Sequence, residues 1–167
     1  MQAGTATTQK SVQITEQPQQ EASALNDLLD RSAEQRRRVA ALTGQVSRCE
    51  SLSSASQELQ DLATDRQDLV DELDQMDISD LPGSQTLTVD LEDALDASRD
   101  SDRNYADWAD EAGDAGCPRG GPAPHTAAYR AAQSTDQLAT ESKEDFVDLW
   151  NPIASSYGFP ERSAREI

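Results

Sequence analysis

Apolar residues recur at alternating intervals of three and four positions through most of the chain. This spacing places them on one face of an α-helix, while charged and polar residues occupy the other faces. The pattern predicts amphipathic helices over residues 22–50, 54–76, 85–111 and 126–150. In the second of these, Arg66 is the only polar residue in an otherwise apolar seam.

Turn-forming residues separate the predicted helices. Ser54 and Gln57 fit a capping box at the start of the second helix. Residues 81–83, Leu-Pro-Gly, predict a stop and a turn, because proline lacks a backbone donor and glycine accepts a positive φ. Ser84 is then expected to cap the third helix. A run rich in glycine and proline between residues 112 and 124 predicts the loop before the fourth helix.

The C-terminal residues predict the end of the fourth helix and one further turn. Asn151 and Pro152 are expected to interrupt the helix. Asn151 then caps a short helical turn, which Gly158 terminates. Tyr157 and Phe159 are expected to fold back over the end of the helices.

Four one-sided helices joined by short breaks bury their apolar faces most simply as an antiparallel bundle. We therefore predict an all-α fold in which residues 22–167 form an up-down-up-down four-helix bundle. The small apolar residues of the last two helices favour this bundle over the alternative, a parallel coiled-coil rod. Residues 1–21 are rich in Gln, Thr, Ser and Ala and predict a disordered, flexible polar linker. Four aromatic residues are expected to fill one end of the bundle: Tyr105, Trp108, Phe146 and Trp150.

Composition alone points to a different conclusion. Leu, Val, Ile and Phe total 27 of 167 residues and the net charge is −18, a combination typical of disordered chains. The helical spacing overrides that indication but leaves a thin core. The charge repels phosphate backbones and argues against nucleic-acid binding. No apolar stretch approaches the roughly 20 residues of a membrane span, so membrane contact is expected only through a tether absent from this chain.

Cys49 and Cys117 are the only cysteines. In an up-down-up-down bundle the first and third connections lie at the same end, and these two residues fall at those connections. A disulfide between them is therefore expected, and it points to an oxidising compartment. The alternative is a small core residue at Cys49 and an exposed thiol at Cys117. Neither cysteine has a neighbouring Cys or His, so we predict no metal site there.

His125 is the only histidine. No serine lies in a nucleophile-elbow sequence that would complete a catalytic triad with it. A single histidine also excludes the paired Glu-x-x-His motifs of carboxylate-bridged di-iron bundles. We therefore predict no catalytic residues, no enzymatic activity and no cofactor.

Asp100, Asp102, Asn104 and Glu111 match four ligand positions of an EF-hand calcium loop. The sixth position carries Tyr105 in place of the glycine that the sharp turn requires. Tyr105 also continues the apolar face of the third predicted helix. A solvated acidic helix without a metal site is the better interpretation.

Two groups of basic residues have different expected environments. Arg36, Arg37 and Arg38 fall on the polar side of the first helix and are expected to be solvated. Arg66 lies in the apolar seam of the second helix. Either it pairs with an acidic residue of a neighbouring helix, or it lies at the edge of the bundle.

The C-terminal third contains the sequence Phe-Val-Asp-Leu-Trp-Asn-Pro-Ile-Ala at residues 146–154, followed by Tyr-Gly at 157–158. The segments 124–130 and 105–109 add to the pattern. Together they resemble an uncharacterised actinobacterial helical domain that is usually extracytoplasmic. The resemblance implies a helical architecture and a location outside the cytoplasm, and it implies no activity and no site residue.

We therefore expect a non-enzymatic acidic helical domain, secreted or on the cell surface, that acts as a structural module or binds a protein or small ligand. Binding is expected at the end that carries the cysteines, where the loop between the last two helices lies. The alternative is an intracellular or virion-associated assembly protein that binds a partner chain, including a role as a DNA mimic. The candidate binding surface comprises Arg119, His125, Tyr129, Trp150 and Tyr157.

Overall fold

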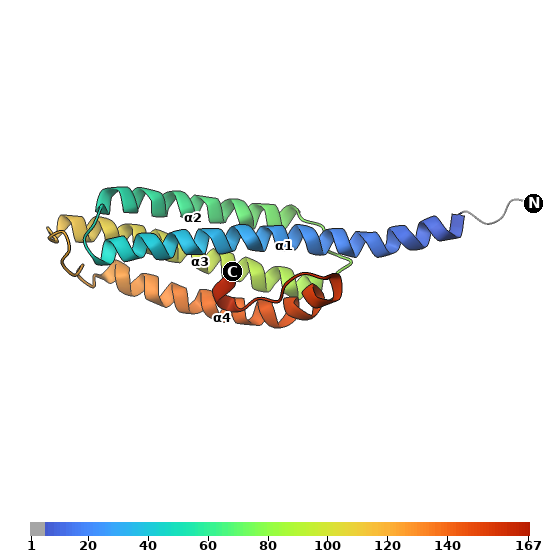
Figure 1. The fold of residues 1–167 in the computed structure, drawn as a ribbon. Helices are drawn as coiled ribbons and strands as arrows, with labels where there is room; N and C mark the ends of the chain where they lie inside the picture. Colours follow the sequence, from blue (N-terminus) through green and yellow to red (C-terminus); the bar gives the residue numbers. More distant parts are fainter. Residues whose placement is uncertain (1–5) are drawn as a thin grey trace, which may run out of the picture.

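The computed structural model describes residues 6–167, with side chains described from residue 16. Over this range it is all-helical and forms an up-down-up-down four-helix bundle (Figure 1), which confirms the predicted fold class. A short segment after the last helix turns back over the bundle and ends near its middle (Figure 1). The elements are α1 (Ala6–Ser47), α2 (Leu52–Gln75), α3 (Ser84–Asp114), α4 (Ala127–Tyr157) and the 3₁₀ turn η1 (Ala164–Glu166).

Helix α1 begins within the segment 1–21, for which the sequence predicts a polar linker. The helix begins at Ala6 and continues through Pro18, so its first turns project beyond the other helices (Figure 1). Burial begins only at Glu21 and Ala22, close to the predicted start of the bundle. Gln and Ala are good helix formers, and a helix that is nucleated in the bundle extends without a second nucleation cost. Residues 1–5 of the predicted linker lie outside the described residues.

The starts of α2 and α3 also differ from the expected caps. Ser54 does not cap α2, because the helix begins at Leu52, and its hydroxyl donates to Glu58 instead. The N-cap is Ser51 in the left-handed conformation, with φ 49°. Ser84 is the first residue of α3, and Gly83 takes the N-cap position with φ 62°. Tight turns with positive φ therefore set both helix starts in place of side-chain caps.

The predicted interruption at Asn151 and Pro152 is wrong. Helix α4 continues through Pro152 to Tyr157 and ends at Gly158, whose φ of 79° matches the predicted terminating role. Asn151 does not cap a new turn. Its side chain accepts from the backbone N–H of Arg162 at 2.8 Å and donates to the Arg162 carbonyl oxygen at 2.9 Å. This contact fixes the C-terminal segment against α4.

The apolar core consists of two clusters at opposite ends of the bundle. The four aromatic residues expected at one end are divided between them. Tyr105 and Trp108 belong to the cluster at the end of the bundle that carries Cys49 and Cys117, which we call the disulfide end. Phe146 and Trp150 belong to the cluster at the opposite end, against which Tyr157 and Phe159 also pack. None of the helices in the described residues is both long and apolar enough to cross a membrane.

Between the two clusters lies a layer of buried polar side chains, to which every helix contributes. We call it the polar layer. Its members are less than one tenth exposed, which is unusual for charged residues unless they are paired. They are Ser32 and Gln35 of α1, Arg66 of α2, Ser98, Ser101 and Asp102 of α3, and Lys143 of α4.

Candidate functional site

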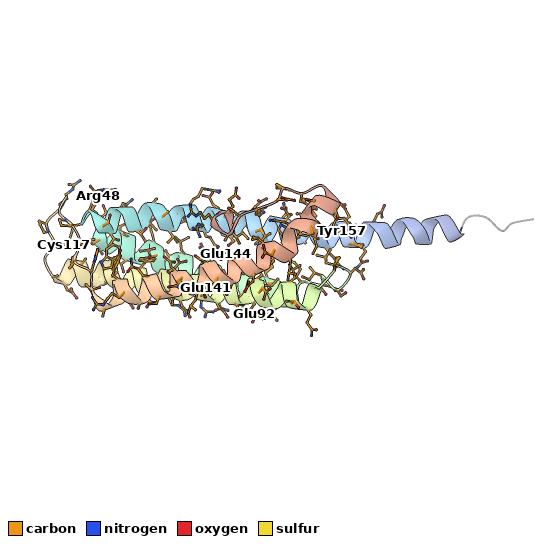
Figure 2. The ribbon with its side chains drawn as sticks, turned by 90° about the horizontal axis from the view of Figure 1, so that it is seen from below. Arg48, Glu92, Cys117, Glu141, Glu144 and Tyr157 are labelled. Atoms are coloured by element: carbon orange, nitrogen blue, oxygen red, sulfur yellow. A yellow bond between two sulfur atoms is a disulfide. The ribbon has the colours of Figure 1, made fainter. Side chains whose placement is uncertain are left out.

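The disulfide joins the two connections at one end of the bundle. Cys49 and Cys117 are bonded, with their Cα atoms 5.9 Å apart, as the predicted topology requires. The loop after α3 is also held by backbone hydrogen bonds from Gly120 to the Arg48 carbonyl oxygen at 2.8 Å and from Ala123 to the Ser47 carbonyl oxygen at 3.0 Å. Figure 2 shows Arg48 and Cys117 together at this end. The two connections therefore form one fixed unit.

An aromatic stack lies beside this unit. The exposed His125 ring stacks on Tyr129, with centroids 4.2 Å apart and an interplanar angle of 16°. Tyr129 in turn packs on the buried Trp108, with centroids 4.7 Å apart. Trp108 is held by a hydrogen bond from its indole nitrogen to the Pro124 carbonyl oxygen at 2.8 Å. Arg119 is exposed in the same loop. Three of the five predicted binding residues thus lie at the disulfide end.

The other two predicted residues lie at the opposite end. Trp150 is fully buried and stacks on Phe146, so its inclusion in the binding surface is wrong. Trp150 lies on the buried face of α4, so its side chain points into the core. Tyr157 is partly buried against the same cluster and lies far from Cys117 along the bundle (Figure 2). The five residues therefore do not form one surface.

Arg66 and Asp102 form a buried ion pair in the polar layer. The Arg66 Nε donates to Asp102 Oδ2 at 2.8 Å, and the two side chains are 2% and 3% exposed. Arg66 Nη1 also donates to the Ser32 hydroxyl at 3.3 Å. Of the two interpretations of Arg66, the pairing with a neighbouring helix is confirmed. Asp102 lies inside the continuous helix α3, so the EF-hand loop is not formed, as expected.

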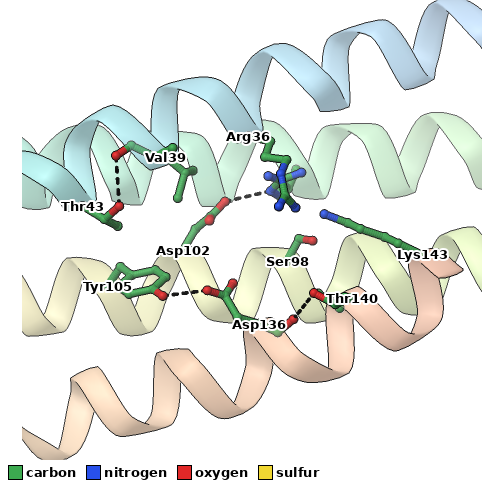
Figure 3. Close-up of a pocket in the computed structure, with 12 residues that line it drawn as sticks. Arg36, Val39, Thr43, Ser98, Asp102, Tyr105, Asp136, Thr140 and Lys143 are labelled. Carbon is green, nitrogen blue, oxygen red and sulfur yellow. Dashed lines mark hydrogen bonds and ion pairs between the residues drawn. The ribbon is translucent and has the colours of Figure 1, made fainter. Parts of the chain in front are cut away.

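A cavity of about 230 Å³ opens beside this ion pair, between α1 and α4 (Figure 3). Arg66, Asp102, Ser98 and Lys143 contribute buried side chains to its wall. Arg36 also lines it and is half-buried, so the prediction that Arg36 is solvated on the polar face is wrong. The adjacent Arg37 and Arg38 are exposed and pair with Glu34 and Asp65, as expected of solvated residues.

Hydroxyl groups of α3 hold the aspartate at the rim of this cavity. Asp136 of α4 accepts hydrogen bonds from Ser101 Oγ and from the Tyr105 hydroxyl, both at 2.6 Å. Burial and this hydrogen bond raise the pKa of Tyr105 above its usual value, so the phenol stays protonated and acts as a donor. The Asp136 carboxylate is therefore held in place by two hydroxyl donors of α3.

Burial shifts the two titratable groups deepest in the cavity in opposite directions. It raises the pKa of Asp102 to about 6, although the neighbouring Arg66 favours the carboxylate. It lowers the pKa of Lys143 to about 7, and the positive charges of Arg66 and Arg36 add to that effect. Lys143 Nζ donates to the main-chain oxygen of Ile167 at 2.9 Å, which places the end of the C-terminal segment over this site.

Lys143 makes the stability of the fold depend on pH. The native pKa near 7 lies below the ordinary value of 10.5, so unfolding takes up a proton between these values and stability is expected to rise with pH. The slope approaches about 1.4 kcal/mol per pH unit at most. Urea titrations from pH about 7 to about 10 measure it, with Lys143→Met as the control that lacks the group. An equal pH dependence in both proteins contradicts the prediction.

Among the described residues, no group of three or more His, Cys, Asp or Glu side chains is arranged to hold a metal ion. Comparisons of the chain with protein-family models, curated proteins and solved structures found no match.

Proposed function

We propose that this chain is a non-enzymatic helical binding module of an oxidising, extracytoplasmic compartment, secreted or on the cell surface. The observation that carries the proposal is the bond between Cys49 and Cys117. Disulfides that persist in folded proteins are typical of secreted and cell-surface proteins, because thiol-reducing systems keep cytosolic cysteines reduced. Here the bond joins the first connection to the one that carries the exposed Arg119 and His125.

The arrangement at the disulfide end suits recognition of a partner protein. His125 presents the outer face of a stack that Tyr129 and Trp108 support from below. Rigid aromatic and arginine side chains supply most of the binding energy at protein interfaces. The disulfide and the backbone hydrogen bonds between the loops reduce the conformational entropy that is lost on binding. Arg119 adds a cationic group to the same loop.

The net charge of the chain indicates which charge the contact surface of a partner would carry. A net charge of −18 repels other strongly acidic surfaces and steers basic ones toward the protein. Electrostatic complementarity acts mainly on the association rate and on selectivity. We therefore favour a partner with a neutral or basic contact surface.

The location is tested in the native host with an epitope-tagged product of the complete gene. Intact cells are treated with protease and, separately, with a thiol-trapping maleimide before lysis and denaturation. We expect the tag to be cleaved in intact cells and Cys49 and Cys117 to escape alkylation until a reductant is added. A protected tag together with two reactive thiols contradicts the proposal and favours an intracellular role.

The binding surface is tested by substituting its exposed side chains. A partner protein is first identified by chemical cross-linking and then purified. Arg119→Ala and His125→Ala are each expected to weaken the binding of this partner about tenfold, which corresponds to about 1.4 kcal/mol. Arg103→Ala on α3 is the control, since it removes an exposed arginine outside the disulfide end. Surface plasmon resonance with the purified partner measures the affinities. Equal effects of all three substitutions contradict a defined surface at this end.

A further inference from the structure

Three cationic side chains from three different helices line one cavity in this strongly acidic protein. Arg36 of α1, Arg66 of α2 and Lys143 of α4 all contribute to the cavity of about 230 Å³ between α1 and α4. Figure 3 shows the ends of the Arg36 and Lys143 side chains directed toward one another. Like charges at short range are unfavourable unless an anion lies between or beside them.

Two carboxylates, Asp102 and Asp136, line the cavity together with the three cationic side chains. Arg66 is paired with Asp102. Among the described ion pairs, neither Arg36 nor Lys143 has a carboxylate partner, and Lys143 donates only to the Ile167 main-chain oxygen. Asp136 accepts from Ser101 and Tyr105 instead. Among the described residues, Arg36 is thus left without a carboxylate at ion-pair distance, and the cavity wall carries one more cationic side chain than carboxylates.

A buried hydroxyl in the same wall also lacks a partner. Ser98 is 4% exposed, lines the cavity, and its Oγ makes no hydrogen bond to any described residue. A buried hydroxyl without a partner is costly, so such groups usually face a bound molecule or water. Arg36, Lys143 and Ser98 together present a guanidinium, an amino group and a hydroxyl. All three donate hydrogen bonds, as the binding of an oxyanion requires.

A second cavity of about 520 Å³ adjoins the first and shares Arg36 and Ala40 with it. Arg37, Arg162 and Arg165 also line this second cavity, together with the acidic residues Asp30 and Glu166. Arginine side chains therefore continue from the cleft toward the C-terminal segment. Two of these arginines are themselves paired, Arg37 with Glu34 and Arg162 with Asp30.

We propose that the cleft between α1 and α4 binds a small molecule through an oxyanion group, a carboxylate, sulfate or phosphate, held between Arg36 and Lys143 with Ser98 as a further donor. The guanidinium of Arg36 supplies a planar pair of donors to two oxygens of the ligand. Lys143 supplies a compact donor from the opposite helix. The site lies in the middle of the bundle and does not depend on the surface proposed for the disulfide end.

Binding of the oxyanion is expected to be accompanied by proton uptake above neutral pH. Burial and the two arginines lower the pKa of Lys143, so a bound anion favours its charged form. The charged and titratable groups around Lys143 are Arg36 of α1, Arg66 of α2, Asp102 and Tyr105 of α3 and Asp136 of α4. The pKa of Lys143 is lowered to about 7, whereas burial raises the pKa of Asp102 to about 6 and that of Tyr105 above its usual value.

The first test is calorimetric titration of the complete chain with sodium phosphate, sodium sulfate and sodium acetate, each against sodium chloride at equal ionic strength. We expect saturable binding of at least one oxyanion with a stoichiometry near one. The phosphate and acetate arms separate a tetrahedral from a planar ligand group. Heats that do not exceed those of chloride for any of the three salts overturn the proposal.

Variants identify the site and separate it from general charge effects. Arg36→Ala is expected to weaken binding at least tenfold, and this half-buried position leaves the core intact. The matched control is Arg38→Ala, which removes the same charge from the same helix at a position that does not line the cleft. We expect it to change the affinity less than twofold. Equal losses in the two variants overturn the proposal and indicate an adventitious ion only.

The number of protons taken up on binding tests the role of Lys143. Titrations at pH about 8 in two buffers of different ionisation enthalpy measure the protons taken up on binding. We expect uptake by the wild-type chain and by Arg38→Ala, and none by Lys143→Met. If Lys143→Met does not fold, the wild-type measurement alone decides. Binding without proton uptake in the wild-type chain overturns the assignment of Lys143 to the site.

Discussion

Replacing Cys49 and Cys117 together by serine is expected to lower the free energy of unfolding by about 4 kcal/mol. The bond spans a sequence separation of 68 residues, and its loss allows the unfolded chain many more conformations. A domain of this size is stabilised by only about 5–15 kcal/mol in total. The disulfide therefore supplies a large share of the stability of a bundle whose large aliphatic and Phe residues number 27 of 167.

Urea unfolding followed by the helical circular dichroism signal measures this loss. Wild-type protein treated with a reductant is expected to match the double serine variant, and the reductant is expected to leave that variant unchanged. This pair of measurements separates the effect of the covalent bond from any effect of the serine side chains. A difference below about 1 kcal/mol between oxidised and reduced wild-type protein contradicts the prediction.

The course of the chain and the position of the disulfide were predictable because both depend on which residues are buried. Leu59, Leu62, Leu69 and Leu73 all lie in the predicted seam of α2, and all are buried. Burial of a one-sided stripe is the main favourable contribution to such a bundle, so its spacing is the most reliable feature of the sequence. Once four antiparallel helices are given, both cysteines fall at the same end.

The helix ends were less predictable because they depend on contacts between distant residues. Ser54 and Ser84 fit a capping sequence, yet residues 49 and 51 and Gly83 take positive φ values and set the starts of α2 and α3 instead. Asn151 precedes proline, but its side chain is bound by the backbone of Arg162. The side chain that could have capped a new turn is thus bound by a segment eleven residues away.

The two residues proposed to bind an oxyanion differ in how far the sequence could have identified them. Lys143 follows the buried Ala139 by four positions and precedes the buried Phe146 by three, a helical spacing that could have placed it on the buried face of α4. Arg36 gave no such signal. It lies at the margin of the buried face of α1, and its environment depends on α4 and on a C-terminal segment that folds back over the bundle.

Replacing Asp102 by alanine is expected to destabilise the fold by about 3–5 kcal/mol, because it leaves the buried Arg66 guanidinium without its carboxylate. Both side chains are almost completely excluded from solvent, so water cannot replace the lost partner. Asp100→Ala is the control on the same helix. Asp100 is about half exposed where it meets Arg99 and Arg103, and its loss is expected to cost no more than about 1 kcal/mol.

A double variant distinguishes the cost of an unpaired charge from a favourable contribution of the pair itself. Arg66→Met combined with Asp102→Leu removes both charges and fills the space with apolar side chains. We expect its free energy of unfolding to recover to within about 1 kcal/mol of the wild-type value or to exceed it, because desolvation offsets most of the attraction in a buried ion pair. A double variant as unstable as Asp102→Ala contradicts this expectation. Such a result means that the pair, with its link to Ser32, specifies how the helices pack.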